Sequence, residues 1–128
     1  MKEIISTPNA PSAIGPYNQG TSFGDLLFLS GQIPLDPQTM ELVGGDDVQA
    51  QTKQVMENLK AVLEEANSSF DNVLKTTCYL SDMDNFVAFN EIYAQYFKAE
   101  TAPARATVAV RTLPKNVLVE VDVIAHKN

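Results

Sequence analysis

The chain has 128 residues, of which 45% are hydrophobic and 20% charged, as is typical of a folded globular protein, and we expect one domain over residues 1–128. Its formal net charge of −7 disfavours phosphate backbones and anionic lipid surfaces, so we expect no nucleic acid and no membrane among its partners. Residues 1–5 lack the apolar run of a signal peptide and Cys78 is the single cysteine, which together favour a cytoplasmic location.

The first predicted element is a β-hairpin whose strands cover residues 17–23 and 26–30. Gly24 and Asp25 stand between the two runs, and glycine takes the positive φ of a two-residue turn at no steric cost. The second run opens with Leu26-Leu27-Phe28-Leu29, which predicts a strand buried on both faces.

A helix is expected next, capped by Asp46, with Gln49 three residues later as the partner of a capping box. Residues at helical spacing predict its apolar face: Val48, Thr52, Val55, Leu59, Val62, Leu63 and Ala66. Residues 73–80 then read as a strand with alternating faces. One of these faces is expected to hold Leu74, Thr76, Cys78 and Leu80.

A second helix is predicted over residues 84–98, capped by Asp82 or Asp84. Its apolar stripe consists of Phe86, Phe89, Tyr93 and Phe97. Two strands follow, over residues 105–111 and 118–125. The order ββ-α-β-α-ββ predicts an α+β fold in which a mixed sheet carries two helices on one face.

Polar residues interrupt the last two strands. Arg105, Thr107 and Arg111 alternate along the first strand, and Glu120 and Asp122 share one face of the second. Because the opposite faces are aliphatic and are expected to meet the helices, the arginines and carboxylates are expected to share the helix-free face. One interpretation is a solvated face with cross-strand ion pairs, which stabilise little. The other is an anion site, in which Arg105 binds a carboxylate through parallel hydrogen bonds and Glu120 handles water or a proton.

Asn90 falls within the apolar stripe of the second helix, where an apolar residue is expected. It is either a satisfied buried amide, a residue at the edge of the stripe, or a residue that faces a ligand or a neighbouring subunit. Core packing is the simpler interpretation of Cys78, and His126 is expected at the surface, so a Cys–His nucleophile pair is not predicted. Neither a metal-ligand cluster nor a Gly-rich phosphate loop occurs, so we expect no metal and no cofactor.

Four motifs, in order along the chain, carry a resemblance to a known family. The first two are Ala10-Pro11-Ser12-Ala13-Ile14-Gly15-Pro16-Tyr17 and Leu29-Ser30-Gly31-Gln32-Ile33-Pro34. The third is Val73-Leu74-Lys75-Thr76-Thr77. The fourth is Pro103-Ala104-Arg105-Ala106-Thr107-Val108-Ala109-Val110, followed by Leu113-Pro114 and Val119-Glu120-Val121. Together they resemble the RidA/YjgF family of imine deaminases, also labelled L-PSP endoribonuclease-like, across essentially the whole chain.

The resemblance implies a chorismate-mutase-like homotrimer whose sheets face inward and whose sites lie in clefts between subunits. It also implies a hydrolase acting on C=N bonds, a deaminase that converts 2-iminobutanoate or 2-iminopropanoate to the 2-keto acid and ammonia. These imino acids are tautomers of the enamines that PLP-dependent dehydratases release, which links the family functionally to those enzymes in amino-acid metabolism. No cofactor is implied for the deaminase itself.

By the same resemblance, Arg105 is expected to bind the substrate carboxylate and Glu120 to hold or activate the attacking water. Four further substrate-binding positions are expected to line the cleft: Tyr17, Ser30, Gly31 and Asn90. Thr107 matches a substrate-binding position at which many members have cysteine, and it is expected to act largely through its backbone.

Two other functions are compatible with these residues. A non-catalytic trimer that binds small carboxylates, for example in regulation, would need Arg105 but not Glu120. A ribonuclease or translation inhibitor, a label that some relatives carry, is disfavoured by the net charge of −7 and by the lack of a basic stripe with interleaved aromatic residues.

Overall fold

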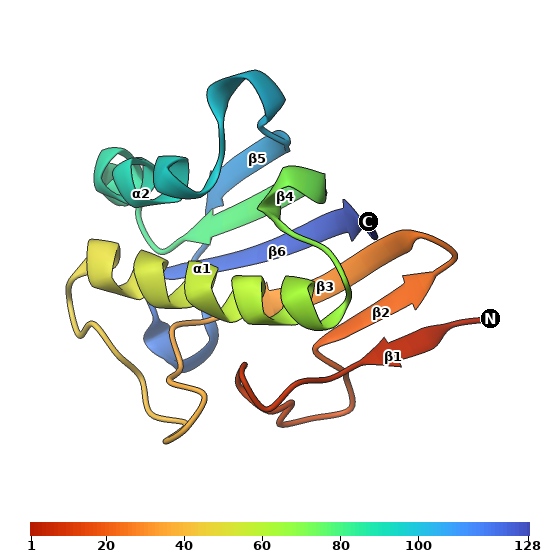
Figure 1. Ribbon diagram of the computed structural model, residues 1–128. Helices are drawn as coiled ribbons and strands as arrows, with labels where there is room; N and C mark the ends of the chain where they lie inside the picture. The colour runs from red at the N-terminus through yellow and green to blue at the C-terminus, as the bar shows by residue number, and fades with distance from the viewer.

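A computed structural model describes all residues 1–128 as one six-stranded sheet with two helices packed against one of its faces (Figure 1). The strands are β1 (Glu3–Ile5), β2 (Gly20–Phe23), β3 (Leu26–Gln32), β4 (Val73–Leu80), β5 (Ala104–Ala109) and β6 (Val119–His126). The main helices are α1 (Val48–Glu65) and α2 (Phe86–Tyr93). The predicted α+β class, with a mixed sheet and both helices on one face, is confirmed. Strand β1 was not predicted, because three residues are too few to establish a periodic pattern.

The sheet order is β1-β2-β3-β6-β4-β5. The neighbouring strands are antiparallel except β4 and β5, which run parallel. The last two strands of the chain are therefore not neighbours, since β6 lies in the centre of the sheet and β5 at its edge (Figure 1). Strand β4 lies between them, and this separation decides where their polar side chains can meet.

The predicted hairpin is confirmed, with Gly24 at a φ of +59° in the turn between β2 and β3. The prediction that β3 is buried on both faces is wrong. Leu27 and Leu29 are buried beneath the helices, whereas Leu26 and Phe28 are 44% and 45% exposed. The apolar run is nearly continuous because the helix-free face of the sheet is also apolar at this strand, although no part of the same chain covers it.

Helix α1 begins one residue later than predicted. Asp47, and not Asp46, is the cap, because its side chain accepts hydrogen bonds from the backbone N–H groups of Gln49 and Ala50. The predicted capping box is also wrong. The amide of Gln49 reaches across to α2 instead, where it donates to the carbonyl of Ala88 at 3.0 Å.

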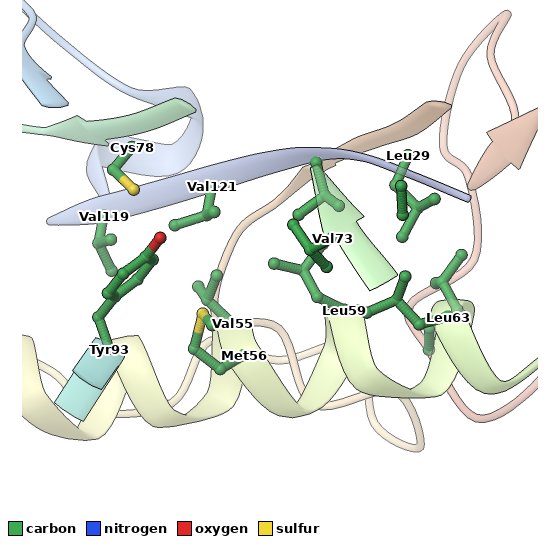
Figure 2. Packing of buried hydrophobic residues seen from close by; sticks show 14 of the residues in the cluster. Leu29, Val55, Met56, Leu59, Leu63, Val73, Cys78, Tyr93, Val119 and Val121 are labelled. Carbon is green, nitrogen blue, oxygen red and sulfur yellow. The ribbon is translucent and has the colours of Figure 1, made fainter. Parts of the chain in front are cut away.

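The predicted apolar stripe of α1 is confirmed, since all seven of its residues are buried. The stripe packs against β3 and β6, and Figure 2 shows Val55, Leu59 and Leu63 pointing from the helix toward the sheet. Each fully buried aliphatic side chain of this size contributes roughly 1.5–3 kcal/mol of transfer free energy. This layer makes the sheet a rigid support for groups on both of its faces.

Strand β4 is confirmed, but its first two residues face opposite to the prediction. Thr76, Cys78 and Leu80 are buried as predicted, whereas Leu74 is exposed and Val73 takes the core position. The cause is an irregularity in the pairing of β4 with β6 between Val73 and Lys75, which shifts the alternation by one residue.

The second helix is shorter than the predicted range 84–98. Asp82 caps a 3₁₀ turn at Met83–Asn85, helix α2 follows, and a second 3₁₀ turn at Ala94–Tyr96 ends the helical stretch. Phe97 is already extended, with φ −132° and ψ 142°. Although Phe97 lies beyond the helix, its ring still packs against that of Tyr93, with 4.8 Å between the ring centroids. The predicted aromatic stripe is therefore longer than the helix.

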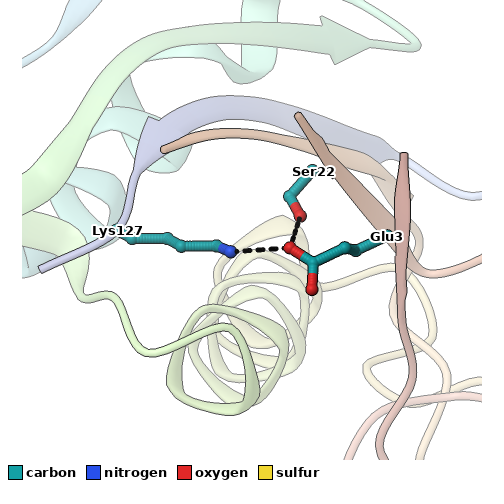
Figure 3. Close-up of polar contacts among 3 residues, drawn as sticks. All are labelled: Glu3, Ser22 and Lys127. Atoms are coloured by element: carbon teal, nitrogen blue, oxygen red, sulfur yellow. Dashed lines mark hydrogen bonds and ion pairs between the residues drawn. The ribbon is translucent and has the colours of Figure 1, made fainter. Parts of the chain in front are cut away.

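The two ends of the chain are held together by an exposed ion pair. Lys127 Nζ lies 3.1 Å from Glu3 Oε1, and the hydroxyl of Ser22 donates to the same oxygen (Figure 3). The hydrogen bond and the charge of Lys127, and then the hydrogen bond of Ser22, lower the pKa of Glu3. An exposed pair of this kind stabilises a fold only slightly. Neither helix has the length and apolar character that crossing a membrane requires.

Candidate functional site

The pairing register places Arg105 and Glu120 on opposite faces of the sheet. Arg105 is paired with Thr76, which is buried on the helix side. Glu120 is paired with Tyr79, and its strand neighbours Val119 and Val121 are the residues that face the core. The prediction that the arginines and carboxylates share the helix-free face is therefore wrong. The faces of β5 are reversed relative to that prediction, so its aliphatic residue Val108 is 44% exposed.

Arg105 lies against helix α2. Its Nη1 donates a hydrogen bond of 2.6 Å to Oδ1 of Asn90, and its guanidinium carbon is 4.7 Å from the ring centroid of Tyr93. Asn90 thus stands in the apolar stripe because it meets an arginine there. These residues line a cavity of about 630 Å³ together with Ala94, Phe97, Ala99, Ala102 and Pro103. A guanidinium at the wall of such a cavity can bind a planar anion.

Thr107 follows Arg105 on the same face of β5 and is paired with Cys78. Its hydroxyl oxygen is buried and has no hydrogen-bond partner within the chain. Burial raises the pKa of the Cys78 thiol to about 11, so that thiol is neutral near pH 7. A neutral, fully buried thiol supports the core-packing interpretation of Cys78.

Glu120 lines a second cavity, of about 430 Å³, at the other face of the sheet. Tyr17, Ser30 and Gly31 line the same cavity, whose apolar wall includes Ile14, Ile33, Leu35 and Pro114. Burial, and then the nearby charge of Asp122, raises the pKa of Glu120 above its usual value. A carboxylate with a raised pKa accepts a proton more readily than an ordinary carboxylate does.

A β-bulge brings Gly31 close to Glu120. Leu29 pairs with Val123 and Gln32 with Val121, so two residues of β3 stand opposite one residue of β6. A Cβ atom at Gly31 would lie only 2.5 Å from Oε2 of Glu120, so the carboxylate occupies the space that glycine leaves open. The bulge and the missing side chain together define where this carboxylate stands.

Two of the predicted residues of the second cavity, Ser30 and Tyr17, are held by hydrogen bonds to the N-terminal segment. The Ser30 hydroxyl donates to the carbonyl oxygen of Asn18 at 2.5 Å, and its backbone N–H donates to the carbonyl oxygen of Gln19. Tyr17 is half exposed, and its hydroxyl accepts a long hydrogen bond of 3.4 Å from the N–H of Ile14. Both side chains are held at the rim of the cavity by local contacts.

Sequence reasoning missed the role of three residues at the site. The first is Gln19, whose buried amide accepts from the N–H of Thr7 at 2.7 Å and donates to the carbonyl oxygens of Thr7, Ala10 and Pro11. It holds the N-terminal loop against the Glu120 cavity. No pattern signals it, because a buried glutamine looks like a surface residue in a sequence. The others, Phe86 and Tyr93, were predicted as members of the apolar stripe but not as neighbours of Arg105. The signal for that role is their place four before and three after Asn90 on one helix face.

The structure thus gathers the predicted site residues into two groups. Tyr17, Ser30, Gly31 and Glu120 form one group, and Asn90 and Arg105 form the other, with Thr107 beside Arg105. Within one chain the sheet separates the two groups.

The helix-free face beside Glu120 carries exposed apolar side chains. Phe28 of β3 and Ile124 of β6 are paired neighbours there, and both are more than a third exposed. The pairing also places Tyr79 and Asp122 on this face, where the tyrosine hydroxyl donates to the carboxylate at 3.3 Å. The surface is therefore an apolar area with a few fixed polar groups, as is common where a protein meets another chain.

Comparison with known proteins defines the family. Residues 7–127 match the family model described as Endoribonuclease L-PSP. A RutC family protein of Pyrococcus horikoshii is 54% identical over 127 residues, which cover 99% of both chains. The chain therefore belongs to this family, and the resemblance to the RidA/YjgF proteins is confirmed.

Solved structures of relatives have the same fold. YyfA of Yersinia pestis, from the conserved Rid protein family, is 48% identical with a TM-score of 0.95, over 98% of this chain and 99% of its own. TdcF of E. coli, solved with bound serine, is 42% identical with a TM-score of 0.91, again over 98% and 99% of the two chains. The match covers both cavities, because it extends over nearly the whole chain.

Proposed function

We propose that this protein is a 2-iminobutanoate/2-iminopropanoate deaminase that works as a homotrimer, with each site built from Arg105 of one subunit and Glu120 of the next. The observation that carries the proposal is the placement of these two residues in separate cavities on opposite faces of one sheet. A single chain cannot apply both groups to one small substrate. Two chains can bring both groups to one substrate if the sheet face that carries Glu120 in one chain lies against the sheet edge that carries Arg105 in another.

The helix-free face supports association with copies of the same chain. Its exposed apolar residues, including Phe28 and Ile124, would be buried in a trimer whose sheets face inward. Each subunit of a cyclic trimer presents one surface to the neighbour on one side and a different surface to the neighbour on the other. Such a contact can join the Arg105 edge of one subunit to the Glu120 cavity of the next at every interface.

In this mechanism Arg105 binds the substrate carboxylate. The guanidinium has no carboxylate partner within the chain, since the ion pair of this structure is Lys127–Glu3. A bidentate guanidinium–carboxylate pair fixes both the position and the plane of a 2-imino acid. This places the imine carbon at a defined point in the cleft.

Glu120 of the neighbouring subunit holds the attacking water. Water adds to the carbon of the protonated imine, and Glu120 takes one of its protons and transfers it to the nitrogen. The carbon–nitrogen bond then breaks with its electron pair leaving on nitrogen as ammonia. The new hydroxyl group gives its proton to the carboxylate of Glu120, which is free again, and becomes the oxygen of the 2-keto acid. The raised pKa of Glu120 suits it to both proton transfers.

A second candidate is a non-catalytic trimer that binds small carboxylates in the same cleft. It is favoured by the relative TdcF, whose structure holds serine, a small molecule with a carboxylate and an amino group. This function requires Arg105 but no proton transfer by Glu120. A ribonuclease is less well supported, because Glu120 in the cavity and the nearby Asp122 would repel a phosphate backbone.

The deciding experiment couples a PLP-dependent threonine dehydratase to trapping of 2-iminobutanoate by semicarbazide. Wild-type protein is expected to lower semicarbazone formation, whereas Arg105→Ala and Glu120→Gln are not. Arg111→Ala is the matched control, since Arg111 is an exposed arginine that lines neither cavity, and it should behave as wild type. If wild type leaves trapping unchanged but binds 2-ketobutanoate through Arg105, the protein is a binding trimer and not a deaminase.

A further inference from the structure

One stripe of helix α2 surrounds the guanidinium of Arg105. Phe86, Asn90 and Tyr93 stand at positions i, i+4 and i+7, so their side chains share a helix face. The guanidinium carbon lies 5.4 Å from the ring centroid of Phe86 and 4.7 Å from that of Tyr93. Both distances are within the range of a favourable cation–π contact. Asn90 accepts from Nη1 between them.

The side chain of Tyr93 is itself held in place by the sheet and by neighbouring rings. Its hydroxyl shares a buried hydrogen bond of 2.8 Å with Oγ1 of Thr76, the β4 residue paired with Arg105. Its ring packs against Phe89 at 5.5 Å and Phe97 at 4.8 Å between centroids. The aromatic surface beneath the arginine is therefore anchored to the same sheet that carries the arginine.

These contacts leave the Arg105 side chain exposed to solvent but restrict its choice of rotamer. An arginine side chain has many rotamers, and ordering it on ligand binding costs conformational entropy. Here the rings and one amide order the side chain in advance, and none of these neighbours is an acid that would neutralise its charge. The remaining N–H groups of the guanidinium stay available for a planar carboxylate.

We propose that Phe86 and Tyr93 are positioning residues that hold Arg105 in its carboxylate-binding orientation. This inference rests on the proposed function, since it assumes that Arg105 binds the substrate carboxylate. The two rings make no contact with the reacting atoms. They set the affinity for the carboxylate, while the neighbouring subunit's Glu120 determines the rate of water addition.

The test compares steady-state constants of Phe86→Leu and Tyr93→Leu with those of wild type, in the coupled dehydratase assay. Loss of one ring is expected to raise KM about threefold to tenfold, the equivalent of a cation–π contact, while kcat stays within about twofold. Tyr93→Phe keeps the ring and its packing against Phe89 and Phe97 but loses the hydrogen bond to Thr76, so its KM should rise less than that of Tyr93→Leu.

Tyr96→Leu is the control for general damage to this region. Tyr96 also packs against an aromatic neighbour, Phe70, but its hydroxyl binds Glu57 and it does not contact Arg105. Its KM should be unchanged. If Tyr93→Leu fails to fold, Phe86→Leu carries the test alone, because Phe86 is only partly buried.

The outcomes separate the two proposals. If Arg105→Ala has no effect on activity, the proposed function itself fails. If Arg105→Ala abolishes activity while KM of Phe86→Leu and Tyr93→Leu stays at the wild-type value, the positioning role is overturned. Equal changes in kcat and KM for these variants and for Tyr96→Leu would likewise overturn it, because that result is what general structural damage produces.

Discussion

Arg105 and Glu120 stand on opposite faces of one sheet, two strands apart, because β4 pairs its buried Thr76 with the arginine and its outward-facing Tyr79 with the glutamate. The separation is a property of register, and no change of side-chain rotamer brings the two groups together through the sheet. A reaction that needs both groups therefore needs two chains. This requirement can be tested directly.

Mixing two inactive variants should restore activity. Arg105→Ala lacks the carboxylate-binding group and Glu120→Gln lacks the base, so each alone is expected to be inactive. When the two are unfolded and refolded together in equal amounts, about one quarter of the sites should receive both native residues if each site takes one from either neighbour. Semicarbazide trapping measures the recovery.

The control for this mixing is the double variant, Arg105→Ala with Glu120→Gln, refolded with either single variant. It should restore nothing, because no site can then contain both groups. Absence of recovery in the original mixture would mean that a site takes both residues from one chain, which contradicts the proposed assembly.

The exposed apolar face should hold the trimer together. Phe28→Glu places a charge in the middle of that face, beside Ile124, and burying an unpaired carboxylate is costly. We expect this variant to sediment as a monomer, with unchanged circular dichroism and without deaminase activity. Val87→Glu is the control, since Val87 is 70% exposed on α2, and it should remain a trimer. A monomeric wild type would contradict the prediction.

Much of the fold was predictable because helices and strands bury one side of a regular pattern. The stripe of α1 is such a pattern, and each of its residues is buried. The exact start of this helix could not be predicted, because Asp46 and Asp47 are equivalent as caps in a sequence. Only the local backbone conformation selects Asp47.

Which side chains of β5 point toward the helices could not be predicted either, for a different reason. Arg105 and Val108 alternate as in any half-buried strand, and the usual rule turns the aliphatic residue inward. In this edge strand the arginine turns inward, because Tyr93 and Asn90 accept it, and Val108 is left exposed. Pairwise contacts between distant segments decided the outcome, and a single sequence does not contain them.

Gly31→Ala should damage catalysis more than folding. The new Cβ would meet Oε2 of Glu120 at 2.5 Å, and since this is the far end of a flexible side chain, the carboxylate can move away. A displacement of this size moves the water that Glu120 holds, so kcat should fall about tenfold to a hundredfold. The melting temperature should change little.

Gly24→Ala gives the opposite result and serves as the control. Gly24 has open space around its α-carbon but a φ of +59°, which an alanine adopts only at a cost of about 1 kcal/mol. We expect lower stability and normal kcat. Equal kcat values for Gly31→Ala and wild type would show that the position of Glu120 is not important for turnover.

The stability of the protein should depend on the ionisation of Glu120. Burial and Asp122 raise the pKa of this carboxyl in the folded chain above its value in the unfolded chain, so the folded state favours the protonated form. The stability associated with the neutral carboxyl is therefore fully present below the unfolded pKa and is lost as the pH rises through the folded pKa.

Glu120→Gln removes the charge, so it should unfold at higher denaturant concentration than wild type above that range and at the same concentration below it. Urea unfolding of both proteins between pH 4 and pH 8, a range chosen around the ordinary glutamate pKa of roughly 4.3, measures the difference. A gap that stays constant over the whole pH range would mean that the carboxyl of Glu120 is not perturbed by its surroundings.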